Sequence, residues 1–95
     1  MNPNKVVREK TETLTDLPNI GKSLAKDLED IGIDTPEKLK GKTPYTLYQR
    51  LCEVRGERQD PCILDIFISI TDFMNGGEPK VWWDYTAERK KKYKL

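Results

Sequence analysis

The stretch "LPNIGKSLAKDL", residues 17–28, joins a sharp turn directly to an amphipathic helix. Pro18 has no N–H to donate, and a proline disfavours the α region for the residue before it, so the preceding segment ends there. Asn19 and Gly21 are residue types that tolerate a positive φ. The apolar residues that follow recur at the spacing of one helix face: Leu24, Leu28 and Ile31. We therefore predict a tight hairpin over residues 18–21, with Ile20 pointing inward, followed by a helix.

The first turn of this helix has the composition of an anion-binding site. The first N–H groups of a helix have no intrahelical partner, and the helix dipole makes that end partly positive. Gly21 lets a phosphate approach the backbone closely, whereas Asn19 adds bulk beside it. Lys22 and Lys26 lie one turn apart and can meet phosphates as point charges. The competing interpretation is a turn that serves only to pack two helices together.

Charge is unevenly distributed along the 95 residues, whose net charge is +1. Residues 1–10 carry +2 and residues 80–95 carry +4, whereas residues 11–79 carry −5. Strong nucleic-acid binders usually have a basic body, so the acidic middle weakens that interpretation. Three further lysines favour nucleic-acid binding if they share a face with the turn: Lys38, Lys40 and Lys42.

The side chains that most enzymes use are scarce. The chain has no histidine, which removes the commonest general base and metal ligand. Cys52 and Cys62 are too few for a disulfide scaffold or a four-cysteine zinc site, and we expect both to be reduced and buried. Asp65 and Asp72 lie two turns apart on one helix, where a solvated stripe or an ion pair with another helix is commoner than a catalytic pair. We expect no enzyme, metal, cofactor or small-molecule substrate, and keep chemistry at Cys62, Asp65 or Asp72 as a third hypothesis.

The hydropathy of the chain excludes a membrane protein. No apolar run approaches the roughly 20 residues of a membrane span, and the first residues, "MNPNKVVREKTET", contain no signal-peptide core. We therefore expect a cytoplasmic protein with no membrane partner.

The rest of the chain predicts further helices. Thr35–Pro36 and Thr43–Pro44 each place a capping hydroxyl before a proline at a first helical position. Asp60–Pro61 opens "DPCILDIFISITDFMNGG", whose apolar spacing predicts a nearly buried central helix that ends at Gly76–Gly77. After this helix, the sequence contains an aromatic cluster that either packs on the helix or stacks on bases: Trp82, Trp83 and Tyr85.

We predict an all-α, compact bundle of about five helices. Residues 1–12 are polar and aperiodic, and we expect a flexible N-terminal arm there. Residues 13–87 form the helical domain, and residues 88–95 form a basic C-terminal tail.

The hairpin resembles the helix-hairpin-helix motif, whose usual hairpin reads Leu-Pro-Gly-Ile-Gly before a basic second helix. The resemblance implies that hairpin backbone amides contact DNA phosphates without reading the base sequence. Carried onto this chain, the nucleic-acid-binding residues are Asn19, Ile20, Gly21, Lys22, Ser23 and Lys26. A weak echo, "VRGERQDPCILDI", is consistent with a tandem arrangement whose second hairpin has degenerated.

Four further pieces extend the resemblance along most of the chain: "GIDTPEKLKG", "LYQRLC", "DPCILDIF" and "WWDYTAERK". Together they resemble the small bacterial pathogenicity-locus family, which is also described as mitomycin-resistance-like helix-hairpin-helix proteins. The first half is also similar to the C-terminal domain of TfoX-type competence regulators. The resemblance implies a SAM-like fold with tandem helix-hairpin-helix motifs, but it implies no activity.

Two functions compete. The first is a non-enzymatic helix-hairpin-helix module that binds the DNA backbone weakly and without sequence preference. The second is a protein-interaction or regulatory module that keeps the fold without DNA binding, which the acidic middle and the degenerate second hairpin favour. The partner is accordingly a nucleic acid or another protein.

Overall fold

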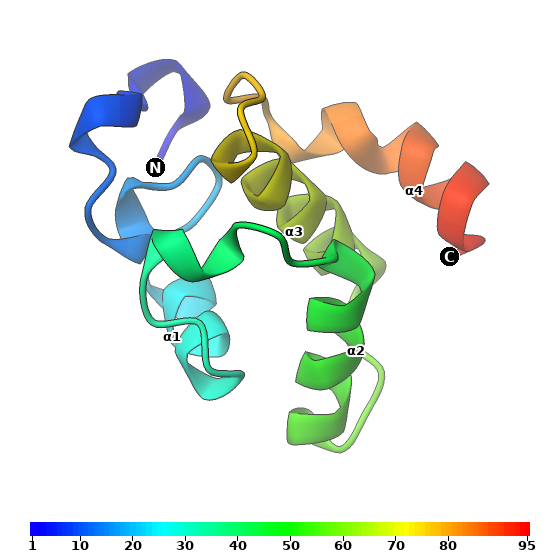
Figure 1. The fold of residues 1–95 in the computed structure, drawn as a ribbon. Helices are drawn as coiled ribbons and strands as arrows, with labels where there is room; N and C mark the ends of the chain where they lie inside the picture. Colours follow the sequence, from blue (N-terminus) through cyan, green and yellow to red (C-terminus); the bar gives the residue numbers. More distant parts are fainter.

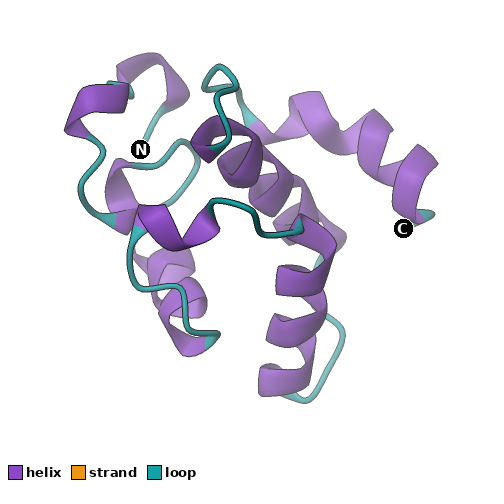
Figure 2. Ribbon diagram, viewed as in Figure 1, coloured by secondary structure: helices purple, strands orange, loops and turns teal.

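Four α-helices form most of the regular structure in the computed structural model, which describes all 95 residues (Figure 1). They are α1 (Lys22–Asp30), α2 (Pro44–Arg55), α3 (Pro61–Met74) and α4 (Thr86–Tyr93). Five short 3₁₀ turns accompany them: η1 (Pro3–Lys5), η2 (Arg8–Lys10), η3 (Leu14–Asp16), η4 (Pro36–Leu39) and η5 (Trp82–Tyr85). Figure 2 shows helices and loops with no strand, so the all-α prediction is confirmed.

The segment that begins at Pro36 is a predicted helix that does not form as an α-helix, whereas α4 lies largely within residues 88–95, which were expected to be a tail. The Pro36 segment forms only the four-residue turn η4, because the chain reverses at Gly41, whose φ is +76°. A run this short cannot offset the cost of starting an α-helix.

The central helix predicted from the apolar spacing is α3, and it organises the core. Its Leu64, Phe67 and Ile70 are completely buried, and α3 contacts α2, α4, η4 and η5. Figure 1 shows α3 in the middle of the molecule, with α1 and the N-terminal segment on one side and α2 and α4 on the other. The radius of gyration is 12.2 Å, close to the roughly 12 Å expected for a compact chain of this length. None of the helices combines the length and apolar character that crossing a lipid bilayer requires.

The polar stripe on α3 is only partly solvated. Asp65 and Ser69 are fully buried, and Asp72 is exposed. Asp65 Oδ1 lies 2.8 Å from Arg89 Nε of α4, and Asp65 Oδ2 accepts a hydrogen bond from Thr86 Oγ1 at 2.7 Å. The alternative of an ion pair with another helix is thus the correct one for Asp65. Arg89 is buried in the domain, and α4 runs across the boundary expected at residue 88.

Three helical segments begin at the prolines that the sequence predicts, Pro36, Pro44 and Pro61. Only the segment that begins at Pro61 has a capping side chain. Thr35 and Thr43 occupy the N-cap positions of η4 and α2, and neither hydroxyl makes a capping hydrogen bond, which corrects that expectation. Asp60 caps α3, because its Oδ1 accepts a hydrogen bond from the Cys62 N–H at 2.9 Å. That carboxylate satisfies one of the free donors at the start of the helix.

Residues 1–12 lie against the domain. The Met1 amino group donates to the carbonyls of Leu17 and Ile20 at 2.9 and 2.7 Å. Arg8 donates to the Phe73 carbonyl at 2.6 Å, and its guanidinium lies 4.1 Å from the centre of the Phe73 ring. The mobility expected for this segment stays a prediction, whereas its docking site at the end of α3 is defined by these contacts.

Candidate nucleic-acid interface

The hairpin before α1 has the tight turn that the sequence predicts, with a positive φ at one of the two candidate positions. Asn19 adopts a positive φ of +67°, and the Ile20 side chain is buried with 1% of its surface exposed. Gly21 is extended, with φ −100° and ψ −172°, and forms the N-cap of α1. The left-handed residue of the turn is therefore Asn19, and Gly21 does not need the conformational freedom of glycine.

The Asn19 side chain points away from the solvent side of the turn. Its Nδ2 donates to Ser69 Oγ at 3.0 Å and to the Lys80 carbonyl at 2.8 Å. The bulk expected beside an approaching phosphate is thus directed into the protein, where it connects the hairpin to α3 and to the segment before η5. Asparagine combines a tolerated positive φ with this amide donor, which glycine lacks.

The start of α1 presents backbone donors that the protein leaves free. The N–H groups of residues 21–24 donate to no acceptor in the chain, and the first intrahelical bond runs from Ala25 N to Gly21 O at 3.0 Å. α1 has no capping side chain and no acidic residue in its first turn, in contrast to α3 with its Asp60 cap. The partial positive charge of this helix end is therefore not compensated from within the protein.

Gly21 differs from the other five glycines, each of which has either a positive φ or a close neighbour. Four glycines have a positive φ: Gly32, Gly41, Gly56 and Gly76. A Cβ at Gly77 would lie 2.6 Å from Asp72 Cγ, too close to be accommodated without movement. A Cβ at Gly21 would meet nothing within 4 Å. The absence of a side chain at Gly21 leaves an open approach to the free N–H groups.

The remaining predicted site residues are on the surface beside these donors. Lys22 and Ser23 are exposed, and neither side chain makes an ion pair or hydrogen bond in the protein. Lys22 is the first helical residue, where a cation opposes the helix dipole, so it adds to the positive potential at a cost in helix stability. Lys26 is exposed one turn further along, 3.6 Å from Asp30.

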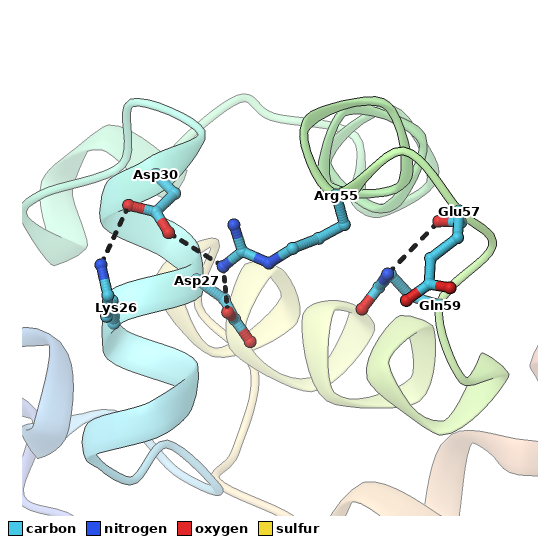
Figure 3. A network of polar contacts seen from close by, with 6 residues as sticks. All are labelled: Lys26, Asp27, Asp30, Arg55, Glu57 and Gln59. Atoms are coloured by element: carbon cyan, nitrogen blue, oxygen red, sulfur yellow. Dashed lines mark hydrogen bonds and ion pairs between the residues drawn. The ribbon is translucent and has the colours of Figure 1, made fainter.

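Two of the three acidic residues of α1, Asp27 and Asp30, are paired at its far end, whereas Glu29 makes no ion pair. Figure 3 shows Arg55, from the end of α2, reaching across to Asp27 and Asp30. Its Nη2 donates to the two carboxylates at 2.5 and 2.9 Å. The Arg55 hydrogen bond, together with the charges of Arg55 and Lys26, holds the pKa of Asp30 below its ordinary value. These pairs reduce the repulsion that α1 itself would exert on a phosphate at its N-terminus.

Lys38, Lys40 and Lys42 do not extend the hairpin surface. They line a separate groove of about 560 Å³ beyond the other end of α1, which Lys22 and Lys26 do not line. Arg50 of α2 completes this groove and was missed by the sequence reasoning. Its spacing of four residues from Thr46, which also lines the groove, places both side chains on the same face of α2 and could have indicated that Arg50 belongs there. Lys38 and Lys40 are paired with acidic neighbours at 2.7 and 3.1 Å, closer than the 3.6 Å between Lys26 and Asp30.

Comparison with known proteins identifies the family. The model of the pathogenicity-locus family, Cdd1, matches residues 7–91. The chain belongs to this family. It is also 42% identical over 78 residues to "Mitomycin resistance protein McrB" of Streptomyces lavendulae, an overlap that covers 82% of this chain and 74% of the relative. No solved structure matches the chain. The family resemblance drawn from the sequence motifs is confirmed.

The aromatic cluster of this pathogenicity-locus protein divides between core and surface. Tyr85 is buried, and its hydroxyl donates to Asp72 Oδ2 at 2.8 Å. Trp82 is partly buried, whereas Trp83 has 60% of its surface exposed. The two indole rings meet edge-on, with centroids 5.4 Å apart. The sequence left both roles open, and the structure assigns packing to Tyr85 and exposure to Trp83.

The three residues considered for catalysis, Cys62, Asp65 and Asp72, are in unsuitable surroundings. Burial, reinforced by the Asp60 side chain, raises the pKa of the Cys62 thiol, which disfavours the nucleophilic thiolate at neutral pH. Asp65 is fully buried in its ion pair with Arg89, and Asp72 is exposed and bound to Tyr85. The two carboxylates therefore face different environments and do not form a shared site.

Proposed function

We propose that this pathogenicity-locus protein is a non-enzymatic helix-hairpin-helix module that binds the nucleic-acid backbone without sequence preference. In this proposal η3, the 17–20 turn and α1 are the two helices and hairpin of the motif. The phosphate lies against the N–H groups of residues 21–23, with Lys22 and Lys26 as supporting charges. Ile20 anchors the hairpin to the core, and Asn19 fixes its orientation through Ser69 and Lys80.

The observation that carries the proposal is the set of free N–H groups at the start of α1. Asp60 satisfies one such group at the start of α3, and α2, which also has neither a side-chain cap nor a first-turn carboxylate, begins with Pro44, which has no N–H to leave free. α1 has neither, and it adds a cation at its first residue. This arrangement lowers the stability of the free helix and favours a bound anion. The open approach at Gly21 supports the same conclusion.

The charge distribution sets the expected strength of binding. Two lysines at the hairpin and an acidic surrounding segment predict contact with about two phosphates, so log K should fall with log[salt] with a slope of about −1.8 for duplex DNA and about −1.4 for a single strand. Affinity should therefore be weak at physiological salt and should rise when the salt is diluted. A basic surface that engaged many phosphates would give a much steeper slope.

Fluorescence anisotropy with labelled oligonucleotides, single-stranded and duplex, at low salt tests the proposal. The double variant Lys22→Glu/Lys26→Glu should weaken binding at least tenfold while the helical circular dichroism is unchanged. The single variants Lys22→Glu and Lys42→Glu are matched in charge, and the second lies in the separate groove. Equal losses in these two would place binding elsewhere and refute the hairpin assignment.

A second variant separates the fold from the binding site. Gly21→Ala introduces a methyl group into open space at a residue of ordinary φ, so it should lower stability by no more than about 1 kcal/mol. The same methyl group obstructs the approach to the free N–H groups and should weaken binding severalfold. Unchanged affinity in the folded variant would contradict phosphate contact at this position.

The competing function is a protein-interaction or regulatory module. Its support is the acidic segment, residues 11–79, which carries a charge of −5. Absence of binding to either oligonucleotide at high micromolar concentrations of folded protein would reject the nucleic-acid proposal and leave this alternative.

The name of the Streptomyces relative provides a cellular test. It is called a mitomycin resistance protein, and we extend that role to this chain as part of the proposal. Expression of the chain in a mitomycin-sensitive bacterium should raise the tolerated dose, and the Lys22→Glu/Lys26→Glu variant should lose the effect at equal expression. Equal protection by the variant would separate resistance from the hairpin.

A further inference from the structure

A pocket lies directly beside the hairpin. It has a volume of about 410 Å³, within the range of roughly 300–1,000 Å³ typical of ligand sites. Three segments that are distant in sequence line it: residues 1–3, residues 19–21 and residues 81–83. Residues 81–83, which include Trp82 and Trp83, form the aromatic wall of the pocket. The hydrogen bond from Asn19 Nδ2 to the Lys80 carbonyl, 2.8 Å long, connects the hairpin to this wall.

Trp83 is the exposed part of this wall. The residue has 60% of its surface in water, a larger fraction than any other large hydrophobic residue of the protein. The edge-on contact with Trp82 supports the ring from one side. An indole exposed to this extent contributes little to the core, but it offers a flat π surface at the rim of the pocket.

The charges around the pocket favour an anionic ligand. Lys22 follows the lining residues 19–21 in sequence, and Lys80 precedes the lining residues 81–83. Both lysines are exposed and without an ion pair, and Lys80 Nζ lies 5.9 Å from the centre of the Tyr85 ring. Met1 also lines the pocket, and its amino group donates to the Leu17 and Ile20 carbonyls. Asp84 is the acidic residue adjacent to the aromatic wall in sequence, and it is exposed. A flat aromatic surface beside free backbone donors and lysines matches a nucleotide, which combines a planar base with a phosphate.

We infer that Trp83 stacks an unpaired base, so that the protein prefers single-stranded nucleic acid to duplex. The inference rests on the proposed function, because the phosphate next to the stacked base is the one assigned to the hairpin. In a duplex each base is stacked and paired inside the helix and does not reach Trp83, whereas in a single strand it is free to turn outward. The pocket contacts the base by its face, so no base preference is expected.

Anisotropy titrations of the parent protein and three variants with three labelled probes test the inference. The probes are a single-stranded dT 12-mer, a 12-base-pair duplex, and a 12-mer strand that is abasic at every position except that of the label. The variants are Trp83→Ala, Trp83→Phe and Lys22→Glu. Trp83→Ala should weaken binding to the dT 12-mer by about 5- to 100-fold, the size of one base–aromatic stack. Binding of the duplex and of the abasic strand should stay within twofold, and Trp83→Phe should retain part of the preference. Because Trp83 is exposed, all variants should keep the parental circular dichroism.

The outcomes separate the two proposals. Duplex and single strand bound equally, with a loss in Lys22→Glu and none in Trp83→Ala, would overturn the stacking inference and leave the hairpin function in place. Loss in Trp83→Ala with none in Lys22→Glu would support stacking and reject the hairpin as the phosphate site. An equal loss for the abasic strand in Trp83→Ala would show that the effect is not base stacking.

Discussion

The Asn19 side chain provides the sharpest test of how the hairpin is held on the core. The change Asn19→Gly keeps the left-handed backbone available and brings the turn closer to the usual helix-hairpin-helix sequence. It removes two hydrogen bonds, to Ser69 Oγ at 3.0 Å and to the Lys80 carbonyl at 2.8 Å. From the sequence alone, this substitution would be expected to leave stability nearly unaltered and to tighten phosphate binding. The structure predicts a clear loss of stability.

The size of the loss follows from the contacts. Each hydrogen bond contributes a net 0.5–1.5 kcal/mol, roughly, so the pair contributes about 1–3 kcal/mol. Relief of the positive φ favours glycine by up to about 1 kcal/mol, and the greater freedom of glycine in the unfolded chain opposes it by a similar amount. The two backbone effects offset each other. We therefore expect the free energy of unfolding to fall by about 1–3 kcal/mol, with a melting temperature lower by about 4–24 °C.

Urea unfolding followed by helical circular dichroism measures the loss. Asn19→Ala is the matched control, because it removes the same hydrogen bonds but keeps the backbone strain, so it should be less stable than Asn19→Gly by about 1 kcal/mol. A double-mutant cycle with Ser69→Ala isolates the hydrogen bond to Ser69 and should give a coupling energy of about 0.5–1.5 kcal/mol.

The reasoning would be refuted by an Asn19→Gly variant as stable as the parent, or by a coupling energy of zero. Phosphate affinity should not rise in Asn19→Gly, because the asparagine side chain does not lie in the path of the phosphate. Tighter binding would indicate that this side chain leaves its two acceptors in the free protein.

Three further perturbations test the rest of the domain. Arg89→Met leaves the carboxylate of Asp65 buried without its partner, so the urea-derived free energy of unfolding should fall by about 3–5 kcal/mol; a loss below 1 kcal/mol would show that Asp65 is not charged or not buried. Burial and the Asp72 hydrogen bond raise the pKa of Tyr85 above its ordinary value of 10, so the unfolded chain releases this proton first. Stability should therefore fall as the pH rises above 10, and this fall should be smaller in Tyr85→Phe, as measured by urea unfolding at several pH values; identical profiles would contradict the assignment. Gly77→Ala places a Cβ against the carboxylate of Asp72, which must then leave Tyr85, and should cost about 1–3 kcal/mol in thermal or urea unfolding. Adding Asp72→Ala should recover part of that cost, and no recovery would show that the strain lies elsewhere.

Local features of this protein could be predicted from the sequence because short-range physics determines them. The apolar spacing within residues 61–74 is enough to define a buried helix, since 3.6 residues per turn place those side chains on one face. Asn19 between Pro18 and Ile20 has few alternatives to a tight turn with positive φ. The capping role of Asp60 needs only the N–H two residues later. Family membership also follows from local motifs in a fixed order.

Tertiary structure alone decided which way the side chains of the candidate site face. The acceptors of Asn19 are 50 and 61 residues away in the chain, so no local pattern distinguishes an amide that faces a phosphate from one bonded to the core. The same reason applies to Trp83, which is exposed while Tyr85 two residues later is buried, because the packing of η5 against α3 determines which ring is covered. Spacing likewise could not show that the lysines beyond α1 line a different groove. A helix nine residues long spans about 14 Å, and the chain turns after it, so neighbours in sequence occupy separate surfaces.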